Sequence, residues 1–193
     1  MKKFLLIAVL LVSMVAQAQV AVGSFNNRYA KKELKVSALM KDGKFYCIEI
    51  DCPIKGVGNG FIWVKQKDVD KFRNALIELQ AKFDEWKKIA IENNVKDMDK
   101  EMPVKFPKVT YCWQLRDSYF ATNSPCKFIF AKSDKTIFTC LSYKAVDDTN
   151  KYIDERFTLV FYSSEEIQSL VDLLSKEKID SAIGNPANSD LFK

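Results

Sequence analysis

A glycine-rich segment is the first part of this chain whose residue types suit ligand binding. Residues 55–60 read Lys-Gly-Val-Gly-Asn-Gly and hold three of the six glycines of the chain. Lys55 supplies a cation and Asn59 an amide, while Gly58 and Gly60 let the backbone approach a ligand closely. A phosphate-binding loop opens a helix, whereas an apolar, strand-like run follows this segment. We therefore expect a flexible, ligand-facing connection between two strands and no nucleotide site.

Two aromatic residues form the second candidate site. Tyr119 and Phe120 follow Arg116 in a polar stretch, whereas most other aromatic residues lie at spacings typical of a core. Exposed aromatic side chains anchor sugars and protein partners. The expected ligand-binding residues are Lys55, Gly58, Asn59, Gly60, Arg116, Tyr119 and Phe120.

One pair of carboxylates is a candidate for hydrolytic chemistry. Glu49 and Asp51 alternate onto one face of an expected strand. Glycoside hydrolysis uses two carboxyl groups roughly 5–9 Å apart, and nothing in the sequence indicates the raised pKa that the acid needs. Ser133 and Lys135 lie in an expected turn, which disfavours Ser–Lys chemistry. No residue is therefore assigned a catalytic role.

The chain contains no histidine. This absence excludes the usual Ser-His-Asp and Cys-His nucleophiles. It also excludes the commonest zinc and non-haem iron sites, which rely on imidazole. We expect no metal and no cofactor.

Five cysteines leave the disulfide pattern open. They are Cys47, Cys52, Cys112, Cys126 and Cys140. An oxidising compartment permits disulfides, and the odd count leaves at least one thiol unpaired or paired with another molecule. The alternative is that several are buried small hydrophobic residues.

The N-terminus carries the pattern of a secretory leader. Lys2 and Lys3 precede an apolar run from Phe4 to Ala16, and Ala16-Gln17-Ala18 matches the signal-peptidase pattern. The run of about 13 residues is shorter than the roughly 20 that span a bilayer. We expect residues 1–18 to be a signal peptide, with no later membrane span and a periplasmic or extracellular location.

The remaining residues fit one domain, 19–183, with a loose tail at 184–193. The formal charge of +5 is spread along the sequence. No clustered basic face is visible, so nucleic-acid binding is not expected.

The clearest periodic signal predicts a helix over 68–92 with Asp68 as its N-cap. Its apolar residues step by three and four: Val69, Phe72, Leu76, Leu79, Phe83, Trp86 and Ala90. Such a stripe packs on a sheet or forms a coiled-coil seam. Ile77, Ile89 and Ile91 widen the apolar face, which favours packing on a sheet and a monomer.

Strands and a second helix complete the expected fold. Asp42-Gly43 predicts a hairpin turn, and a loop at 133–135 predicts a second hairpin with Phe130 opposite Phe138 and Phe128 opposite Cys140. Residues 19–32 and 93–107 read as irregular. Ser163 and Glu166 form a capping box that opens a helix ending before Gly184. The expected strands are Leu34–Met40, Phe45–Asp51, Phe61–Val64, Val109–Leu115, Cys126–Ala131, Thr136–Tyr143 and Arg156–Tyr162.

The elements together predict the α+β class. We expect an antiparallel sheet of about six to seven strands, with one long and one shorter helix on one face. A strand-then-helix pattern recurs at an offset of 98 residues, which a duplicated β-meander-plus-helix unit would explain. The alternative, which we favour slightly, is that any strand followed by an amphipathic helix gives this pattern. The function that fits best is a non-catalytic exported module that binds a protein or carbohydrate. The alternatives are a small hydrolase with a carboxylate pair and an inhibitor of a foreign protease or lysozyme.

Overall fold

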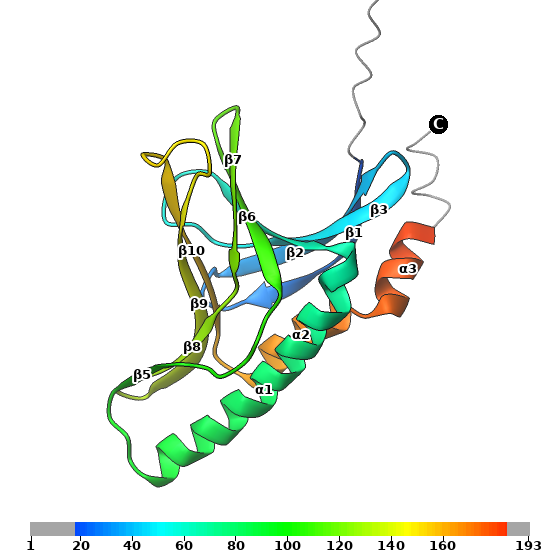
Figure 1. Ribbon diagram of the computed structural model, residues 1–193. Helices are drawn as coiled ribbons and strands as arrows, with labels where there is room; N and C mark the ends of the chain where they lie inside the picture. The colour runs from blue at the N-terminus through cyan, green and yellow to red at the C-terminus, as the bar shows by residue number, and fades with distance from the viewer. Residues whose placement is uncertain (1–17, 185–193) are drawn as a thin grey trace, which may run out of the picture.

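The computed structural model describes residues 18–184 and shows an α+β fold (Figure 1). The predicted class is therefore confirmed. The strands are β1 (Ala18–Asn27), β2 (Lys32–Lys41), β3 (Lys44–Asp51), β4 (Asn59–Lys65), β5 (Met98–Glu101), β6 (Lys108–Leu115), β7 (Ser118–Pro125), β8 (Phe128–Ser133), β9 (Thr136–Val146) and β10 (Asp154–Phe161). The helices are α1 (Val69–Glu92), α2 (Ser164–Leu173) and α3 (Lys176–Gly184), and a short 3₁₀ turn, Gln66–Asp68, precedes α1.

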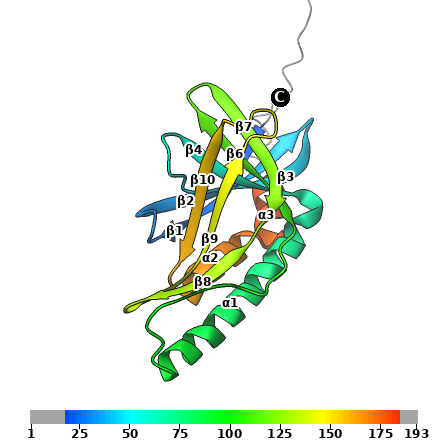
Figure 2. The same cartoon turned by 60° about the vertical axis from the view of Figure 1, so that its left-hand side comes forward.

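The described strands form two antiparallel sheets where the sequence predicted one. Their orders are β1-β2-β3-β4-β6-β7 and β10-β9-β8-β5, and Figure 2 shows the second sheet lying across the first. The segment after β3 joins them. Ile54 forms a bridge with Phe157 of β10, and the Thr158 N–H donates to the Pro53 carbonyl at 2.8 Å.

Three strands, β1, β5 and β7, were not predicted from the sequence, so the structure has more strands than expected. In β1 the register shifts between Ala21 and Gly23, and this bulge breaks the alternation by which strands are recognised. β5 is a four-residue edge strand, and β7 forms the edge of the larger sheet. Edge strands carry many polar residues because one side of each faces water.

The two predicted hairpins have different outcomes. Asp42 and Gly43 adopt positive φ values of 52° and 71° in the turn between β2 and β3, as expected. In the β8–β9 hairpin the turn holds two residues, so Phe130 pairs with Thr139 and Phe128 with Leu141. The predicted register was wrong by one residue because Asp134 takes a positive φ of 48° and tightens the turn.

Helix α1 packs in the core of its own chain, as its stripe predicted. Val69, Phe72, Leu76, Leu79, Phe83 and Ala90 are buried. Ile77, Ile89 and Ile91 are exposed, so the expectation that they widen the buried face was wrong. Asp68 occupies the N-cap position, but its side chain makes no capping hydrogen bond.

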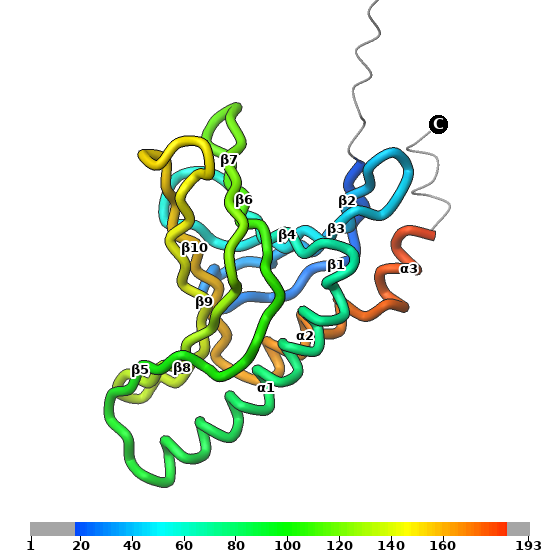
Figure 3. The backbone as a smooth tube through the Cα atoms, viewed as in Figure 1, coloured from blue at the N-terminus to red at the C-terminus, as the bar shows by residue number. Residues whose placement is uncertain are grey.

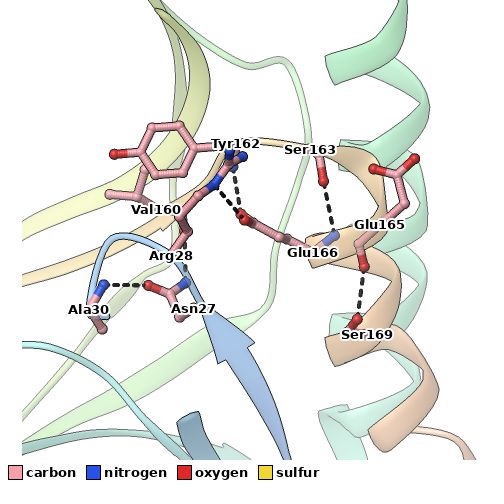
Figure 4. Close-up of polar contacts among 9 residues, drawn as sticks. All are labelled: Asn27, Arg28, Ala30, Val160, Tyr162, Ser163, Glu165, Glu166 and Ser169. Atoms are coloured by element: carbon pink, nitrogen blue, oxygen red, sulfur yellow. Dashed lines mark hydrogen bonds and ion pairs between the residues drawn. The ribbon is translucent and has the colours of Figure 1, made fainter. Parts of the chain in front are cut away.

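The second helix is capped by Ser163, as predicted, but the Glu166 carboxylate accepts from a backbone N–H one residue earlier than a capping box requires. The Glu166 N–H donates to Ser163 Oγ at 3.4 Å. The Glu166 side chain reaches back to the Tyr162 N–H, with Oε2 at 2.7 Å, and not to that of Ser163 (Figure 4). The helical segment is interrupted after Leu173, which divides it into α2 and α3.

Both halves of the chain run from strands into a helix, as the internal similarity predicted. β4 leads into α1 and β10 into α2, and the two helices lie side by side (Figure 3). Arg73 of α1 donates to the Val171 carbonyl of α2 at 3.1 Å.

Most of the expected signal peptide, 1–18, and of the expected tail, 184–193, lies outside the described residues, which retain only Ala18 and Gly184 of the two segments. Both remain predictions. Among the described residues, no helix is both long enough and apolar enough to cross a membrane.

Candidate functional site

The outward face of the six-stranded sheet contains a groove of about 660 Å³. Strand alternation creates it, because Ile48 and Ile50 of β3 enter the core while Glu49 and Asp51 face the other side. We name it the Glu49 groove. It is lined by Gln19, Lys35, Leu39, Glu49, Asp51, Asn59, Phe61, Trp63, Cys112, Tyr119, Phe120 and Ala121.

Glu49 is held at the floor of this groove by two side-chain donors. Trp63 lies directly opposite it on β4, and its Nε1 donates to Glu49 Oε2 at 2.6 Å. Gln19 of β1 donates through Nε2 to Glu49 Oε1 at 2.9 Å. With both oxygens bonded, Glu49 is only 8% exposed.

The surroundings of Glu49 change its acidity. Burial raises its pKa above 4.5, the bond from Trp63 opposes that rise, and the nearby charge of Asp51 adds to it. Burying a carboxylate away from water disfavours its charged form. A group held in this way is a candidate for ligand binding or proton transfer.

A second carboxylate stands two residues along the same strand. Asp51 Oδ2 accepts a hydrogen bond from the Lys35 N–H at 3.1 Å. Lys35 is also the one cationic residue among the lining residues of the groove, set against two acids. The groove is therefore weakly acidic and rich in hydrogen-bond acceptors.

Aromatic rings form much of the remaining surface. Phe61 and Trp63 of β4 are half-buried, and Tyr119 of β7 is 68% exposed at the rim. Phe120 also borders the groove, but its ring packs 5.7 Å from that of Trp113, which is in the core. The combination of apolar rings and a few fixed polar groups is typical of small-molecule sites.

The structure brings several expected ligand-binding residues to this groove. Asn59, Tyr119 and Phe120 are lining residues. Gly58, Asn59 and Gly60 line an adjoining cavity of about 160 Å³. Lys55 and Arg116 line neither cavity, and Arg116 lies in the β6–β7 turn with a φ of 55°.

The glycine-rich loop, which we expected to be flexible, is hydrogen-bonded to β10 at its first two residues. The Lys55 N–H donates to the Arg156 carbonyl at 3.0 Å and the Gly56 N–H to Glu155 Oε1 at 3.1 Å. At Gly58, whose φ is 140°, a Cβ would lie 2.1 Å from the Gln114 carbonyl oxygen. This close approach places the loop against the end of β6, so the two candidate segments of the sequence are neighbours.

Sequence reasoning missed Trp63, Gln19 and Lys35 as partners of the two carboxylates. The available signal was alternation, which places Glu49 on one face of β3 and Trp63 on one face of β4. The pairing of these residues depends on the length and path of the connection between the strands, which alternation does not specify.

The five cysteines are buried and free, without a disulfide. Cys112 borders the Glu49 groove, and burial raises the pKa of its thiol to about 12. Such a thiol is a poor nucleophile at neutral pH. Among residues 18–184, no three histidine, cysteine, aspartate or glutamate side chains cluster as a metal site.

Comparisons with protein-family models, curated proteins and solved structures found no match. The function is therefore inferred from the groove.

Proposed function

We propose that this chain is an exported binding protein that holds a carbohydrate in the Glu49 groove. The observation that carries the proposal is Glu49 itself, a nearly buried carboxylate fixed by Trp63 and Gln19 beside exposed aromatic surface. Export rests on the leader pattern of residues 1–18.

The chemistry of the groove suits a sugar. The rings of Phe61, Trp63 and Tyr119 offer apolar surface to the C–H faces of a pyranose. The carboxylates of Glu49 and Asp51 accept hydrogen bonds from hydroxyl groups, and charge-assisted bonds of this kind are the stronger ones. A volume of about 660 Å³ lies within the range of small-molecule sites and fits a short glycan segment.

The test is calorimetric titration of the purified chain with a panel of neutral and amino-sugar oligosaccharides. We expect Tyr119→Ala to weaken binding of a positive glycan by roughly tenfold, since one aromatic contact contributes about 1 kcal/mol or more. Tyr152→Ala is the matched control, because Tyr152 is also an exposed tyrosine but is not a lining residue. Equal losses in both variants, or no binding across the panel, would reject the proposal.

A carboxylate-dependent hydrolase is the second candidate, favoured by the raised pKa of Glu49 beside Asp51. Neighbouring residues on one face of a strand are about 6.6 Å apart at roughly 3.3 Å per residue, which is close to the separations used in glycoside hydrolysis. Release of reducing ends from a bound glycan, abolished by Glu49→Gln, would favour hydrolysis. Unchanged glycan after prolonged incubation would favour binding alone.

A further inference from the structure

A second groove, of about 850 Å³, lies between the end of α1 and the β8–β9 hairpin. Five of its lining residues are cationic and two are acidic. We name it the basic groove. Its cations are Arg28, Lys87, Lys96, Lys132 and Lys135, and its acids are Asp97 and Asp134.

Most of these cations form no salt bridge. In residues 18–184, Arg28 is the only one of the five that takes part in one, with Glu166. Lys87 interacts with the charge of Glu165 without forming a salt bridge. The Lys132 ammonium donates to the main-chain carbonyl of Asp134 and not to its carboxylate. The groove therefore holds an excess of positive charge in a hollow, where its field is stronger than on a convex surface.

The end of α1 does not need these lysines to satisfy its carbonyl groups. The Asn94 N–H donates to the Ile91 carbonyl at 3.1 Å, and the Val95 N–H to the Ala90 carbonyl at 3.0 Å. Together with the φ of 49° at Asn94, these bonds form a Schellman cap. The helix dipole contributes about half a negative charge here, which is smaller than the excess of two cations that remains once Arg28 is paired with Glu166.

Arg28 is already held in place for a ligand (Figure 4). Its Nε donates to Glu166 Oε1 at 3.1 Å, and its guanidinium carbon lies 4.6 Å from the centre of the Tyr162 ring. The bond through Nε leaves the two terminal amino groups for other acceptors. An arginine fixed in this way loses little conformational entropy when it binds an anion.

We propose that the basic groove binds a soluble ligand that carries two or more phosphate or sulfate groups. The cations come from three separate parts of the fold: the β1–β2 turn, the end of α1 and the β8–β9 hairpin. A ligand with several anionic groups can pair with cations from more than one of these parts at once. Ile91, Val95 and Ile137 add apolar surface for its carbon skeleton. A hollow lining favours a molecule that enters it over a flat bilayer.

The probes are inorganic pyrophosphate and a sulfated hexasaccharide, titrated by calorimetry into the full mature chain. We expect the Lys132→Ala/Lys135→Ala double variant to weaken binding of both probes by roughly tenfold or more, since each charge-assisted hydrogen bond is worth about a factor of ten. The Lys41→Ala/Lys44→Ala double variant is the control. It removes the same charge from two exposed lysines that flank the β2–β3 turn.

The control separates a site from general charge attraction. A tenfold loss in the hairpin variant, with the control within about twofold of wild type, supports the basic groove. Equal losses in both variants, or no binding of pyrophosphate and none of the hexasaccharide, would overturn it. Vesicles of anionic phospholipid are a third probe, and binding to the vesicles alone would also overturn it. Tyr119→Ala, in the Glu49 groove, should leave pyrophosphate binding unchanged, so this test is independent of the proposed sugar site.

Discussion

Trp63 Nε1 lies 2.6 Å from Glu49 Oε2, across the pairing of β3 with β4. This bond holds the indole ring, which lines the groove. It also supports a carboxylate whose burial disfavours the charged form. Groups that are buried at a cost to stability often occur where function needs them.

Glu49→Gln should stabilise the chain more at neutral pH than in acid. The folded-state pKa of Glu49 is raised, so between the unfolded pKa and the folded one the native state binds more protons than the unfolded state. Its contribution to the free energy of unfolding therefore falls as pH rises through that window. Urea unfolding at about pH 4 and about pH 7 measures the difference between variant and wild type at each pH.

Glu92→Gln, on the exposed surface of α1, is the control for loss of one charge. The pH dependence of the Glu49→Gln difference should exceed that of the control. If the gain of Glu49→Gln were instead larger in acid, the carboxylate would be stabilised in its charged form and the assigned cause of the shift would be wrong.

Gly58→Ala should destabilise the chain and alter the wall of the cavity that adjoins the Glu49 groove. The added Cβ would lie 2.1 Å from the Gln114 carbonyl oxygen, at a φ of 140° that side chains rarely adopt. Strain of this kind costs about 1–3 kcal/mol. Thermal unfolding measures it, with Gly184→Ala as the control because Gly184 has no neighbouring atom of residues 18–184 within 4 Å of an added Cβ. Equal melting temperatures for the two variants would show that the loop accommodates the added Cβ without loss of stability.

The elements whose side chains follow one strict period were predictable from sequence. The stripe of α1 repeats at three and four residues, so its buried side, including Leu76 and Phe83, follows from helical geometry. The β2–β3 hairpin follows from the positive φ values that Asp42 and Gly43 accept. In both cases neighbours along the chain determine the structure.

The grooves were less predictable because residues distant in sequence build them. Gln19 meets Glu49 only because β1 pairs at the far side of β2, and the bulge near Gly23 hides β1 in the pattern. The lysines of the basic groove come from α1, from the segment that follows it, and from the β8–β9 hairpin about 40 residues further along the chain. The even spread of charge along the chain therefore concealed a local concentration on its surface.

The cysteines should react slowly in the folded chain and completely once it is unfolded. Burial raises the thiol pKa of Cys47 and Cys112 to about 12 and that of Cys140 to about 11. Because the thiolate is the reactive form, alkylation at about pH 8 should become faster on adding denaturant. Mass spectrometry of the exported chain, alkylated in denaturant without reductant, counts the thiols. Five labelled cysteines would agree with the free state, and three or one would show disulfides.

Phe83→Asp should unfold the monomer, because Phe83 is fully buried and its ring lies 6.0 Å from that of Phe130 on the smaller sheet. An unpaired charge at this position costs several kcal/mol, comparable to the whole stability of a domain of this size. The milder Phe83→Ala should lower the free energy of unfolding by about 3–5 kcal/mol and leave a folded chain for measurement. Ile89→Asp is the control on the same helix, since Ile89 is 48% exposed. It should change stability by less than about 1 kcal/mol.

Light scattering together with denaturant titration tests the alternative that α1 is a subunit interface. In that case the wild-type chain would be a dimer and Phe83→Asp would give a folded monomer.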